Sequence, residues 1–519
     1  MDFDVIVVGS GFGGSVAALR LSEKGYKVAV LEMGRRVTRQ AIEKANQSPL
    51  DLFWMPALGL KGFFVQRFFK HATIVGGVGV GGGSLVYAAV LLEPKKAFYQ
   101  DKAWNKMGID WENELRPHYQ TAAHMLGRVT CPTSGIQDGW LRQTAAEMNV
   151  GDSYGPVPLG IFFGEANTPD PFFGGKGPAR NGCLEKGACL AGCANGAKNT
   201  LDKNYLYLAE QLGAQIIPEH KVTLIRQTPD GYYLEMTNPL TGEKYPALSA
   251  GKVILAAGVL GTLEILFRCQ AAQTLPNLSP MLGQRVRTNS EAITGVLSKN
   301  PDDDLTRGPA ISSDFHANEH THVTQNRLPA SYWFMKLYSG PLVDGFNPFL
   351  RAFKTLGYFL RHPLESTASL RVLKDWHKRI TLISTMQNAD NQMAFTWAGF
   401  PGKGLQSATP TGRSAPTYIP EANQAARTFA QVSGGTAHNA LLESVLNMSV
   451  TAHILGGCGI GIDATNGVID QQHEVFGCPG MYVVDGAAIP ANVGVNPSLT
   501  ITAMAERAMS HIPAKAEQA

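Results

Sequence analysis

The sequence predicts an α/β fold, α+β overall, in which a Rossmann-like dinucleotide-binding domain is built from discontinuous segments. A second domain is expected to contain an antiparallel sheet with covering helices. A strand, a glycine turn, a helix and a second strand follow one another over residues 4–31. Similar patterns occupy residues 198–271, and the chain returns to them from residue 450. Residues 296–449 lack this alternation, which is typical of a separate domain.

The opening segment is a dinucleotide fingerprint in its required context. An apolar strand at 4–8 breaks into a turn with Gly9, Gly11 and Gly14, and a helix then leads to the strand at 28–31. Gly9 allows a tight turn, Gly11 lets the backbone approach a pyrophosphate, and Gly14 lets the helix and the strand pack closely.

Other groups complete this predicted site. Phe12 and Gly13 begin the helix, where unpaired N–H groups and the helix dipole favour an anion. Glu32 follows the second strand and is placed to accept hydrogen bonds from a ribose diol. A second glycine run at 77–82 also matches the fingerprint, but no helix, strand and acid follow it. We therefore do not interpret it as a second nucleotide site.

Length and composition set limits on the kind of protein. The 519 residues allow two or more domains, and a net charge of +3 does not indicate a nucleic-acid partner. The first strand begins close to Met1, which leaves no room for a signal peptide. No apolar run reaches the roughly 18 residues of a membrane span. Seven cysteines form no even framework. We expect a cytoplasmic protein, with peripheral membrane contact as an open alternative.

The remaining elements are predicted from periodicity and turn residues. Helices are expected at 104–115, 119–126 and 140–148, before an irregular stretch at 151–182. Further along the chain we expect a helix at 198–212, strands at 214–218, 222–226, 232–236 and 252–258, and a helix at 262–271.

We assign these elements to two domains. The dinucleotide-binding domain comprises residues 1–38, 70–95, 198–295 and 450–519; the substrate-binding or cap domain comprises residues 39–69, 96–197 and 296–449. Residues 38–70 are rich in aromatic side chains and form either a flap over an apolar pocket or a loop packed on the sheet. Residues 347–378 are basic and amphipathic, and form either a membrane-docking face or lid helices packed over the pocket.

Two polar residues near the C-terminus are suited to proton handling beside a redox cofactor. His453 and Asn496 each lie in a glycine-rich turn, and a strand-turn-helix return brings the two turns together. Histidine titrates near neutral pH, so His453 is a candidate proton acceptor. Asn496 is either a second site residue or a helix N-cap.

These blocks, in this order, resemble the glucose–methanol–choline (GMC) family of flavin oxidoreductases, and most closely its cholesterol-oxidase branch. Scattered matches run from residue 4 to about residue 508. Five motifs carry the resemblance: Gly76-Gly-Val-Gly-Val-Gly-Gly-Gly-Ser84, Asn199-Thr-Leu-Asp-Lys-Asn-Tyr205, Ala256-Ala-Gly-Val-Leu-Gly261, His453-Ile-Leu-Gly-Gly-Cys458 and Val493-Gly-Val-Asn-Pro497.

The resemblance implies FAD rather than NAD as the cofactor, and no metal ligands. It implies that Val222 lies near the adenine, Asp485 and Gly486 lie by the ribityl chain, and Asn496 and Pro497 lie under the isoalloxazine ring. The other residues that it implies at the cofactor are Gly79, Gly82, Gly83, Ser84, Tyr87, Ala257 and Gly258.

The resemblance also implies oxidation of a bulky hydrophobic alcohol, with a sterol favoured, by hydride transfer to flavin N5. His453 and Asn496 then act on the reacting hydroxyl, and O2, a quinone or a protein accepts the electrons. Two alternatives stay open. One is a flavin dehydrogenase for long-chain or terpenoid alcohols with a non-oxygen acceptor; the other is an electron-transfer or redox-sensing flavoprotein that uses Cys183–Cys193.

Two features depart from the family pattern. Cholesterol oxidases carry a middle-domain glutamate that isomerises the initial ketone, but Thr324 or Gln325 occupies its place in this sequence. The absence of this glutamate argues against isomerisation. Cys183, Cys189 and Cys193 have a spacing close to that of a ferredoxin-type cluster. Because one ligand position is taken by Lys186, we favour small buried thiols or a redox-labile cluster over a metal site.

Overall fold

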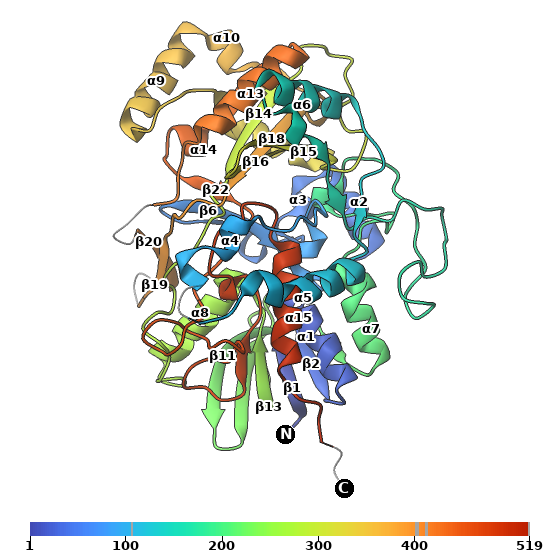
Figure 1. Cartoon of the computed structure of the whole chain (residues 1–519), viewed down its shortest axis with the longest axis vertical. Helices are drawn as coiled ribbons and strands as arrows, with labels where there is room; N and C mark the ends of the chain where they lie inside the picture. Colours follow the sequence, from blue (N-terminus) through green and yellow to red (C-terminus); the bar gives the residue numbers. More distant parts are fainter. Residues whose placement is uncertain (105–106, 400–403, 410–413, 517–519) are drawn as a thin grey trace.

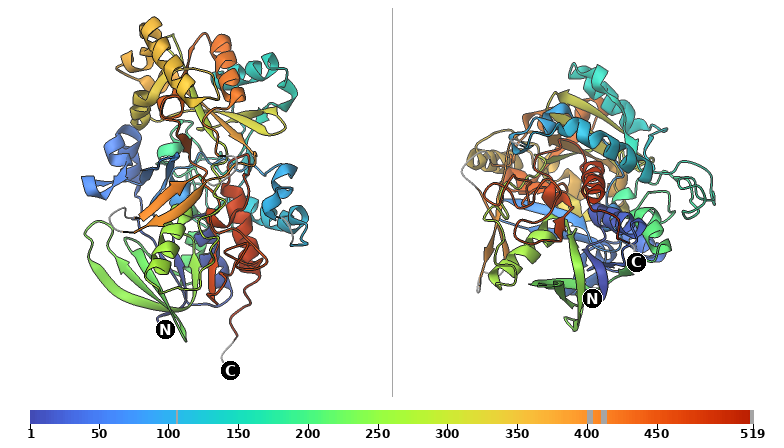
Figure 2. Two further views of the ribbon diagram at one scale, coloured as in Figure 1. Left: turned by 90° about the vertical axis from the view of Figure 1, so that its left-hand side faces the viewer. Right: turned by 60° about the horizontal axis from the view of Figure 1, so that its bottom comes forward.

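The computed structural model describes residues 1–104, 107–399, 404–409 and 414–516. The molecule is elongated, with a large sheet toward each end (Figure 1). Both termini lie at the end that holds the N-terminal strand, whereas α9 (Pro348–Arg361) and α10 (Pro363–Ser366) lie at the opposite end. The rotated view in Figure 2 (left) shows the same separation. The predicted α/β fold class is confirmed; the predicted domain boundaries stay a proposal.

The sheet at the end that holds both termini is here called the lower sheet. It contains seven strands among the described residues, in the order β10-β2-β1-β13-β12-β11, with β23 beside β13. The β10-β2-β1-β13-β23 part is parallel, whereas β13, β12 and β11 are antiparallel. β1 and β2 are buried almost throughout, as in a parallel sheet covered on both faces. The strands are β1 (Phe3–Val8), β2 (Val28–Leu31), β10 (Gln215–Ile217), β11 (Lys221–Thr228), β12 (Gly231–Thr237), β13 (Lys244–Leu255) and β23 (Met481–Val483).

Helices from both ends of the chain cover this sheet. α1 packs against α7 and α15, and α15 packs against α5, so the C-terminal helix closes onto the N-terminal fingerprint. The helices are α1 (Phe12–Glu23), α5 (Trp111–Met125), α7 (Tyr205–Gln211), α8 (Gly258–Ala271) and α15 (Ser498–Ser510).

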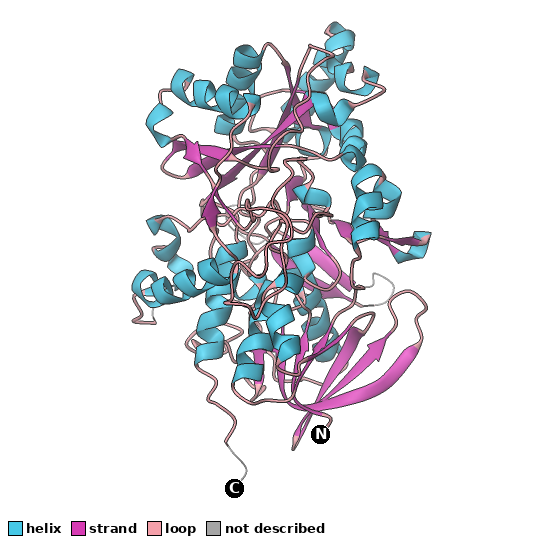
Figure 3. Ribbon diagram, turned by 90° about the vertical axis from the view of Figure 1, so that its right-hand side faces the viewer, coloured by secondary structure: helices cyan, strands magenta, loops and turns pink. Residues whose placement is uncertain are grey.

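The sheet toward the opposite end of the molecule is here called the upper sheet. It is antiparallel, in the order β17-β21-β14-β18-β16-β15-β8. α6 (Ile136–Glu147) and α13 (Pro420–Ser433) pack on one face of it, where Leu141 and Phe429 meet Phe315, Val323 and Ile383. Figure 3 shows these helices around the strands. The strands are β8 (Gly155–Pro156), β14 (Ala292–Leu297), β15 (Ser313–Asn318), β16 (Thr321–Asn326), β17 (Ser339–Pro341), β18 (Ile380–Gln387) and β21 (Thr436–Ala440).

Smaller elements join the two sheets. β22 (Ser449–Thr451) pairs with β6 (Ala72–Gly77), which pairs with β5 (Phe64–Phe68). The aromatic segment 38–70 packs on η7 (Ala330–Tyr338), with the Phe53 and Phe334 ring centroids 4.9 Å apart. The other short elements include α2 (Arg39–Gln47), α3 (Pro49–Leu52), β3 (Trp54–Met55), β4 (Leu60–Lys61), η2 (Gly82–Leu85), α4 (Lys96–Tyr99), β7 (Val129–Thr130), β9 (Pro158–Leu159), η6 (Leu201–Lys203), α11 (Ala368–Arg371), α12 (Trp376–Arg379), β19 (Ala394–Ala398), β20 (Gly404–Ala408) and α14 (Leu441–Ser444).

The two helices predicted at 104–115 and 119–126 are wrong, because the single helix α5 replaces them; residues 105–106 lie outside the described residues. The helix begins where the Asp110 carboxylate accepts a hydrogen bond from the Asn113 N–H at 3.2 Å. Pro117 lies inside α5. Burial of Leu115 and Tyr119 on either side of it shows that tertiary packing overrides the poor helix propensity of proline.

Two further boundaries differ from the prediction. α7 begins at Tyr205 rather than 198, because Asn204 Oδ1 accepts a hydrogen bond from the Tyr205 N–H at 2.6 Å and caps the helix there. The strand predicted at 252–258 begins earlier, at Lys244, since its first half pairs with β12.

α9 is amphipathic, but its apolar face points outward. Phe349, Phe353 and Leu360 are 77%, 71% and 76% exposed, whereas Arg351 and Thr355 are each 1% exposed. The alternative of lid helices packed through this apolar stripe is therefore wrong. No helix in the described part of the chain has both the length and the apolar character needed to cross a membrane. The Arg351 guanidinium donates hydrogen bonds to the carbonyls of Gly345 and Glu443 and to the side chains of Thr417 and Asn447.

We predict that Gly14 and Gly11 respond differently to replacement by alanine. A Cβ on Gly14 would lie 2.0 Å from the Gly9 carbonyl oxygen, whereas one on Gly11 meets no atom within 4 Å. Gly14→Ala should lower the free energy of unfolding of the cofactor-free protein by about 1–3 kcal/mol. Gly11→Ala should change it by less than about 0.5 kcal/mol.

Gly11→Ala should instead weaken FAD binding, because the added methyl group enters the space that the pyrophosphate approaches. Urea unfolding and FAD titration of the apoprotein measure the two effects. Equal loss of stability in both variants, or unchanged FAD affinity in Gly11→Ala, would contradict this interpretation of the turn.

Candidate active site

His453 and Asn496 lie next to each other, although they are far apart in the sequence. His453 follows β22, which runs between the two large sheets (Figure 1), and Asn496 precedes α15. The His453 Nε2 atom is 3.4 Å from the Asn496 Nδ2 atom. The Asn496 Oδ1 atom is buried and has no hydrogen-bond partner among the described residues. The two predicted residues therefore form one site that has an acceptor atom to spare.

Asn496 is not a helix cap. Pro497 occupies the N-cap position of α15, and no side chain caps that helix end. The alternative interpretation of Asn496 as an N-cap is therefore wrong, and its amide is available to a bound molecule.

Glu291 is a third member of this site, which no sequence motif indicated. Its Oε1 atom lies 3.2 Å from the His453 Nδ1 atom, within ion-pair range although out of line for a hydrogen bond. Its Oε2 atom accepts a hydrogen bond from the Ala452 N–H at 2.9 Å. Burial raises the pKa of Glu291, but the neighbouring His453 and the hydrogen bond from the Ala452 N–H contribute to lowering it overall. Glu291 is thus an ionised carboxylate that faces the imidazole.

The N-terminal turn ends in an uncapped helix. α1 has Gly11 at its N-cap, no side-chain cap and no acidic residue in its first turn. Such a helix end suits an anion, because its first N–H groups have no partner inside the helix. Glu32 accepts hydrogen bonds from the Gly34 N–H at 2.8 Å and the Ser10 hydroxyl at 2.6 Å. Burial raises the pKa of Glu32.

The second glycine run packs directly on the first. A Cβ on Gly82 would lie 2.7 Å from the Gly11 Cα atom, and a Cβ on Gly83 would touch the Phe12 ring at 3.7 Å. Gly79 has a φ of +142°, which a residue with a side chain rarely adopts. The Ser84 hydroxyl closes the turn by donating to the Gly81 carbonyl at 2.6 Å. The two glycine runs are therefore in direct contact through their backbones.

Tyr87 and Lys198 hold the loop after this run. The sequence motifs indicated Tyr87 but not Lys198. The Tyr87 ring packs edge-on against Phe12 with centroids 5.5 Å apart, and its hydroxyl donates to the Asn199 carbonyl at 2.6 Å. The Lys198 ammonium donates to the carbonyls of Leu85 and Tyr87 at 2.9 Å and 3.1 Å. Burial lowers the pKa of Lys198 to about 8.

The C-terminal block reaches the same turn from the other side. A Cβ on Gly13 would lie 2.0 Å from the Val484 carbonyl oxygen, directly before Asp485 and Gly486. Asp485 accepts hydrogen bonds from the Thr262 hydroxyl at 2.5 Å and from the Ala487 N–H at 2.8 Å. Burial raises the pKa of Asp485 to about 6.

The remaining predicted cofactor residues lie in the turn after β13 and on β11. Ala257 is the N-cap of α8, and a Cβ on Gly9 would lie 2.9 Å from the Ala257 Cα atom. Gly258 has a φ of +72° and faces open space. Val222 is a buried residue of β11.

These residues fit FAD. The open space at Gly11 and the uncapped end of α1 suit a pyrophosphate. The buried carboxylates of Glu32 and Asp485 suit ribose and ribityl hydroxyl groups, and the unpaired Asn496 Oδ1 atom leaves a polar contact for the ring or the substrate.

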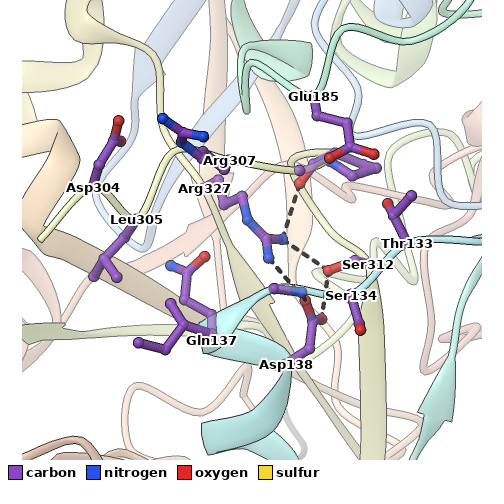
Figure 4. Close-up of a pocket in the computed structure, with 14 residues that line it drawn as sticks. Thr133, Ser134, Gln137, Asp138, Glu185, Asp304, Leu305, Arg307, Ser312 and Arg327 are labelled. Atoms are coloured by element: carbon purple, nitrogen blue, oxygen red, sulfur yellow. Dashed lines mark hydrogen bonds and ion pairs between the residues drawn. The ribbon is translucent and has the colours of Figure 1, made fainter.

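Gln325 is committed to a polar network in the upper sheet. Its amide donates to Asp138 Oδ1 and Ser312 Oγ, each at 2.8 Å, and Asp138 forms a buried ion pair with Arg327 at 2.9 Å. This network borders a cavity of about 340 Å³ (Figure 4). The cavity contains neither His453 nor Asn496 in its lining, so it is not the site of the redox chemistry.

Thr324 points to the opposite face of β16, since side chains alternate along a strand. Its hydroxyl is buried without a hydrogen-bond partner among the described residues. Asp314 lies directly across from it on β15, and the Asp314 Oδ2 atom is 2.8 Å from the His322 Nε2 atom. A carboxylate therefore lies next to Thr324, where the family carries its glutamate, but the sequence alone did not place Asp314 there.

Of the three clustered cysteines, Cys189 is buried, and Cys183 and Cys193 are half-buried. Cys189 packs in an apolar cluster that Cys183 and Cys193 adjoin. Burial raises the pKa of Cys183 to about 12 and also raises that of Cys189, so both stay protonated at neutral pH. Within the residues that the structure describes, no group of three His, Cys, Asp or Glu side chains could hold a metal ion. The thiols therefore lack the character of a reactive redox site.

Known proteins resemble this chain over its whole length. A family model described as GMC oxidoreductase matches residues 369–505, and one described as an NAD(P)-binding Rossmann-like domain matches residues 7–53. A cholesterol oxidase of Mycobacterium tuberculosis is 43% identical, covering 99% of this chain and 92% of that protein. A cholesterol oxidase of Acinetobacter baumannii is 39% identical, covering 99% and 95%.

More distant relatives share the fold. A long-chain-alcohol oxidase of Arabidopsis thaliana is 24% identical, covering 97% of this chain and 66% of that protein. The crystal structure of pyridoxine 4-oxidase from Mesorbium loti matches with a TM-score of 0.63 at 15% identity, covering 98% of both chains. The chain therefore belongs to the GMC oxidoreductase family and is an FAD-dependent oxidoreductase that acts on alcohols.

Proposed function

We propose that this enzyme oxidises a bulky hydrophobic alcohol, with a sterol favoured, to the ketone or aldehyde. The observation that carries the proposal is the convergence of His453 Nε2 and Asn496 Nδ2, 3.4 Å apart, in one partly buried site. FAD, when bound, supplies the hydride acceptor at its N5 atom. The protein must then hold the hydroxyl group and remove its proton.

His453 and Asn496 divide this work. The lone pair on His453 Nε2 accepts the hydroxyl proton as the carbinol C–H bond breaks, so that the product carbonyl forms without a free alkoxide. A positioned proton acceptor of this kind contributes about 10²–10⁴-fold to the rate. The Asn496 amide donates a hydrogen bond to the substrate oxygen and orients it.

A sterol is favoured because the cholesterol oxidases resemble this chain over almost its whole length. We do not propose isomerisation of the product. Neither Thr324 nor Gln325 is a base that can carry a proton between two carbons, and the Asp314 carboxylate is engaged by His322.

O2 is the proposed electron acceptor, since the two cholesterol oxidases and the long-chain-alcohol oxidase described above are named as oxidases. The second candidate is a dehydrogenase for long-chain or terpenoid alcohols that passes electrons to a quinone or a protein; the similarity to the long-chain-alcohol oxidase supports its substrate class. An electron-transfer or redox-sensing role for Cys183–Cys193 is not proposed, because burial raises the pKa of the Cys183 and Cys189 thiols and keeps them protonated at neutral pH.

The enzyme is proposed to be cytoplasmic and to take its substrate from a membrane surface. The contact is made by residues 346–374, here called the docking face. Exposed apolar side chains cover it: Phe346, Phe349, Leu350, Phe353, Leu356, Leu360, Leu364, Leu370 and Leu373. Exposed basic residues lie among them, namely Lys354, Arg361, Arg371 and Lys374. Apolar and basic side chains on one face suit an anionic lipid surface.

The docking face is tied to the active site. Arg351, on the inner side of α9, donates a hydrogen bond to the Glu443 carbonyl at 2.9 Å. Glu443 belongs to α14, and the chain continues from α14 through β22 to His453. One hydrogen bond and a short stretch of chain therefore connect the docking face to the loop that carries His453.

We predict that a sterol bleaches the oxidised-flavin absorbance of the purified enzyme in the absence of oxygen. The His453→Ala variant should keep its bound FAD, but the alcohol should reduce this flavin at least about 10²-fold more slowly, because the proton acceptor is missing. Stopped-flow absorbance measures both rates. Bleaching by linear alcohols alone would favour the second candidate, and no bleaching by any alcohol would overturn the proposal.

We predict that the double variant Phe349→Ser, Phe353→Ser binds anionic phospholipid vesicles about tenfold more weakly or worse. Each exposed phenylalanine buried in lipid contributes roughly 1.5–3 kcal/mol. Leu212→Ser is the control, since Leu212 is also apolar and 53% exposed but lies outside the docking face. Vesicle sedimentation measures binding. Equal binding by both variants and the wild type would remove the docking face from the proposal.

A further inference from the structure

We propose that residues 287–291, here called the positioning segment, set the geometry of the active site, and that Glu291 is the positioning residue for His453. This inference rests on the proposed function, since it assigns His453 as the proton acceptor. The segment ends one residue before β14, where the chain passes from the lower part of the molecule into the upper sheet.

The contacts of Glu291 leave one imidazole nitrogen free. The Glu291 carboxylate faces His453 Nδ1 at 3.2 Å, so this nitrogen carries the ring proton. The Nε2 nitrogen then has a lone pair, and in the structure it faces the N–H groups of Asn496 Nδ2. The ring is therefore held in the tautomer that can take a proton from an alcohol.

The proton balance of the step follows from this arrangement. The alcohol O–H bond breaks and an Nε2–H bond forms, while the hydride of the carbinol carbon leaves for the flavin. His453 becomes an imidazolium ion, and its positive charge faces the negative charge of Glu291. A buried carboxylate stabilises that charge more than water would, because the surroundings screen it less.

Glu291 acts through His453 and not on the substrate. One carboxylate oxygen faces the imidazole, and the other accepts the Ala452 N–H at 2.9 Å. The side chain is buried, with 4% of its surface exposed. Neither oxygen is left to reach a substrate carbon.

Other residues of the segment hold both catalytic turns. The Arg287 N–H donates to the Leu455 carbonyl at 2.8 Å, and the Leu455 N–H donates back at 2.9 Å, next to His453. The Thr451 hydroxyl donates to the Thr288 carbonyl at 2.9 Å. One short stretch of chain thus fixes the loop that carries His453.

Asn289 fixes the turn that carries Asn496. Its Oδ1 atom accepts the Gly494 N–H at 2.7 Å, and its Nδ2 group donates to the Val495 carbonyl at 2.8 Å. Asn289 and Ser290 have φ values of +57° and +44°, and both are fully buried. Two successive residues in the left-handed region are costly and persist only where the surroundings impose them. The strained residues, Asn289 and Ser290, lie where the positioning segment connects the loop of His453 to the turn of Asn496.

The titratable groups that face the Glu291 carboxylate are His453 on the loop after β22 and Glu443 on α14. Glu443 provides a matched control. It is also a buried carboxyl group, and burial raises its pKa to about 8, so it is mostly neutral at pH 7. Glu443→Gln therefore resembles the form already present, whereas Glu291→Gln removes a charge.

We predict that the Glu291→Gln variant keeps its bound FAD, but that the alcohol reduces this flavin about 10- to 100-fold more slowly. A loss of this size is usual when the group that orients a histidine is removed. The rate–pH profile should also differ from that of the wild type, because the substitution removes the negative charge beside the imidazole. Glu291→Asp should recover part of the rate, and Glu443→Gln should stay within about twofold of the wild type. A wild-type rate and profile in Glu291→Gln would overturn the assignment.

A second measurement does not depend on turnover. Nitrogen NMR of the histidine-labelled apoprotein, with His453 identified by its loss in His453→Gln, reports which ring nitrogen carries the proton. Protonated Nδ1 and bare Nε2 in the wild type, with this state lost in Glu291→Ala, support the proposal. Protonated Nε2 in the wild type would overturn it. If no alcohol reduces the flavin yet the tautomer is as expected, the proposed function fails while the role of Glu291 stands.

Discussion

The buried contact between Glu291 and His453 is the interaction on which the site depends. It joins the start of β14 to the loop after β22, two parts of the chain that otherwise belong to different layers of the molecule. Asn289, two residues earlier, ties in the turn before α15. Three distant segments thereby converge on one point, and the Asn496 Oδ1 atom stays unpaired there among the described residues. His453 and Asn496 are therefore positioned by backbone and carboxylate contacts rather than by packing alone.

The predicted cofactor site is shaped by close backbone approach. Gly82 lies against Gly11 and Gly13 lies against Val484, so a side chain is excluded at Gly82 and at Gly13. Lys198 holds the loop after the second glycine run, because its buried ammonium group donates hydrogen bonds to the carbonyls of Leu85 and Tyr87. A dinucleotide needs this shape because its pyrophosphate must come within hydrogen-bond distance of main-chain N–H groups.

Local patterns predicted the parts of the molecule that local chemistry determines. The fingerprint around Gly9 and the adjacency of His453 and Asn496 could be anticipated, because glycine turns and strand–helix returns leave a signal in sequence. Glu291 could not, since it lies in a stretch without a motif and its partner is distant in the chain. The orientation of α9 was also undetermined. Amphipathicity reveals an apolar stripe, but burial of Arg351 decides that the stripe faces outward.

A crystal structure of the FAD-loaded enzyme would test the central claim most directly. The flavin ring should lie beside Asn496 and Pro497, with His453 Nε2 and Asn496 Nδ2 both able to reach one hydroxyl position in front of N5. Glu291 should stay on His453 Nδ1, and Asn289 should keep its bonds to the turn before α15. A structure in which His453 presents Nδ1 to the flavin side, or in which Glu291 turns away from the imidazole, would contradict it.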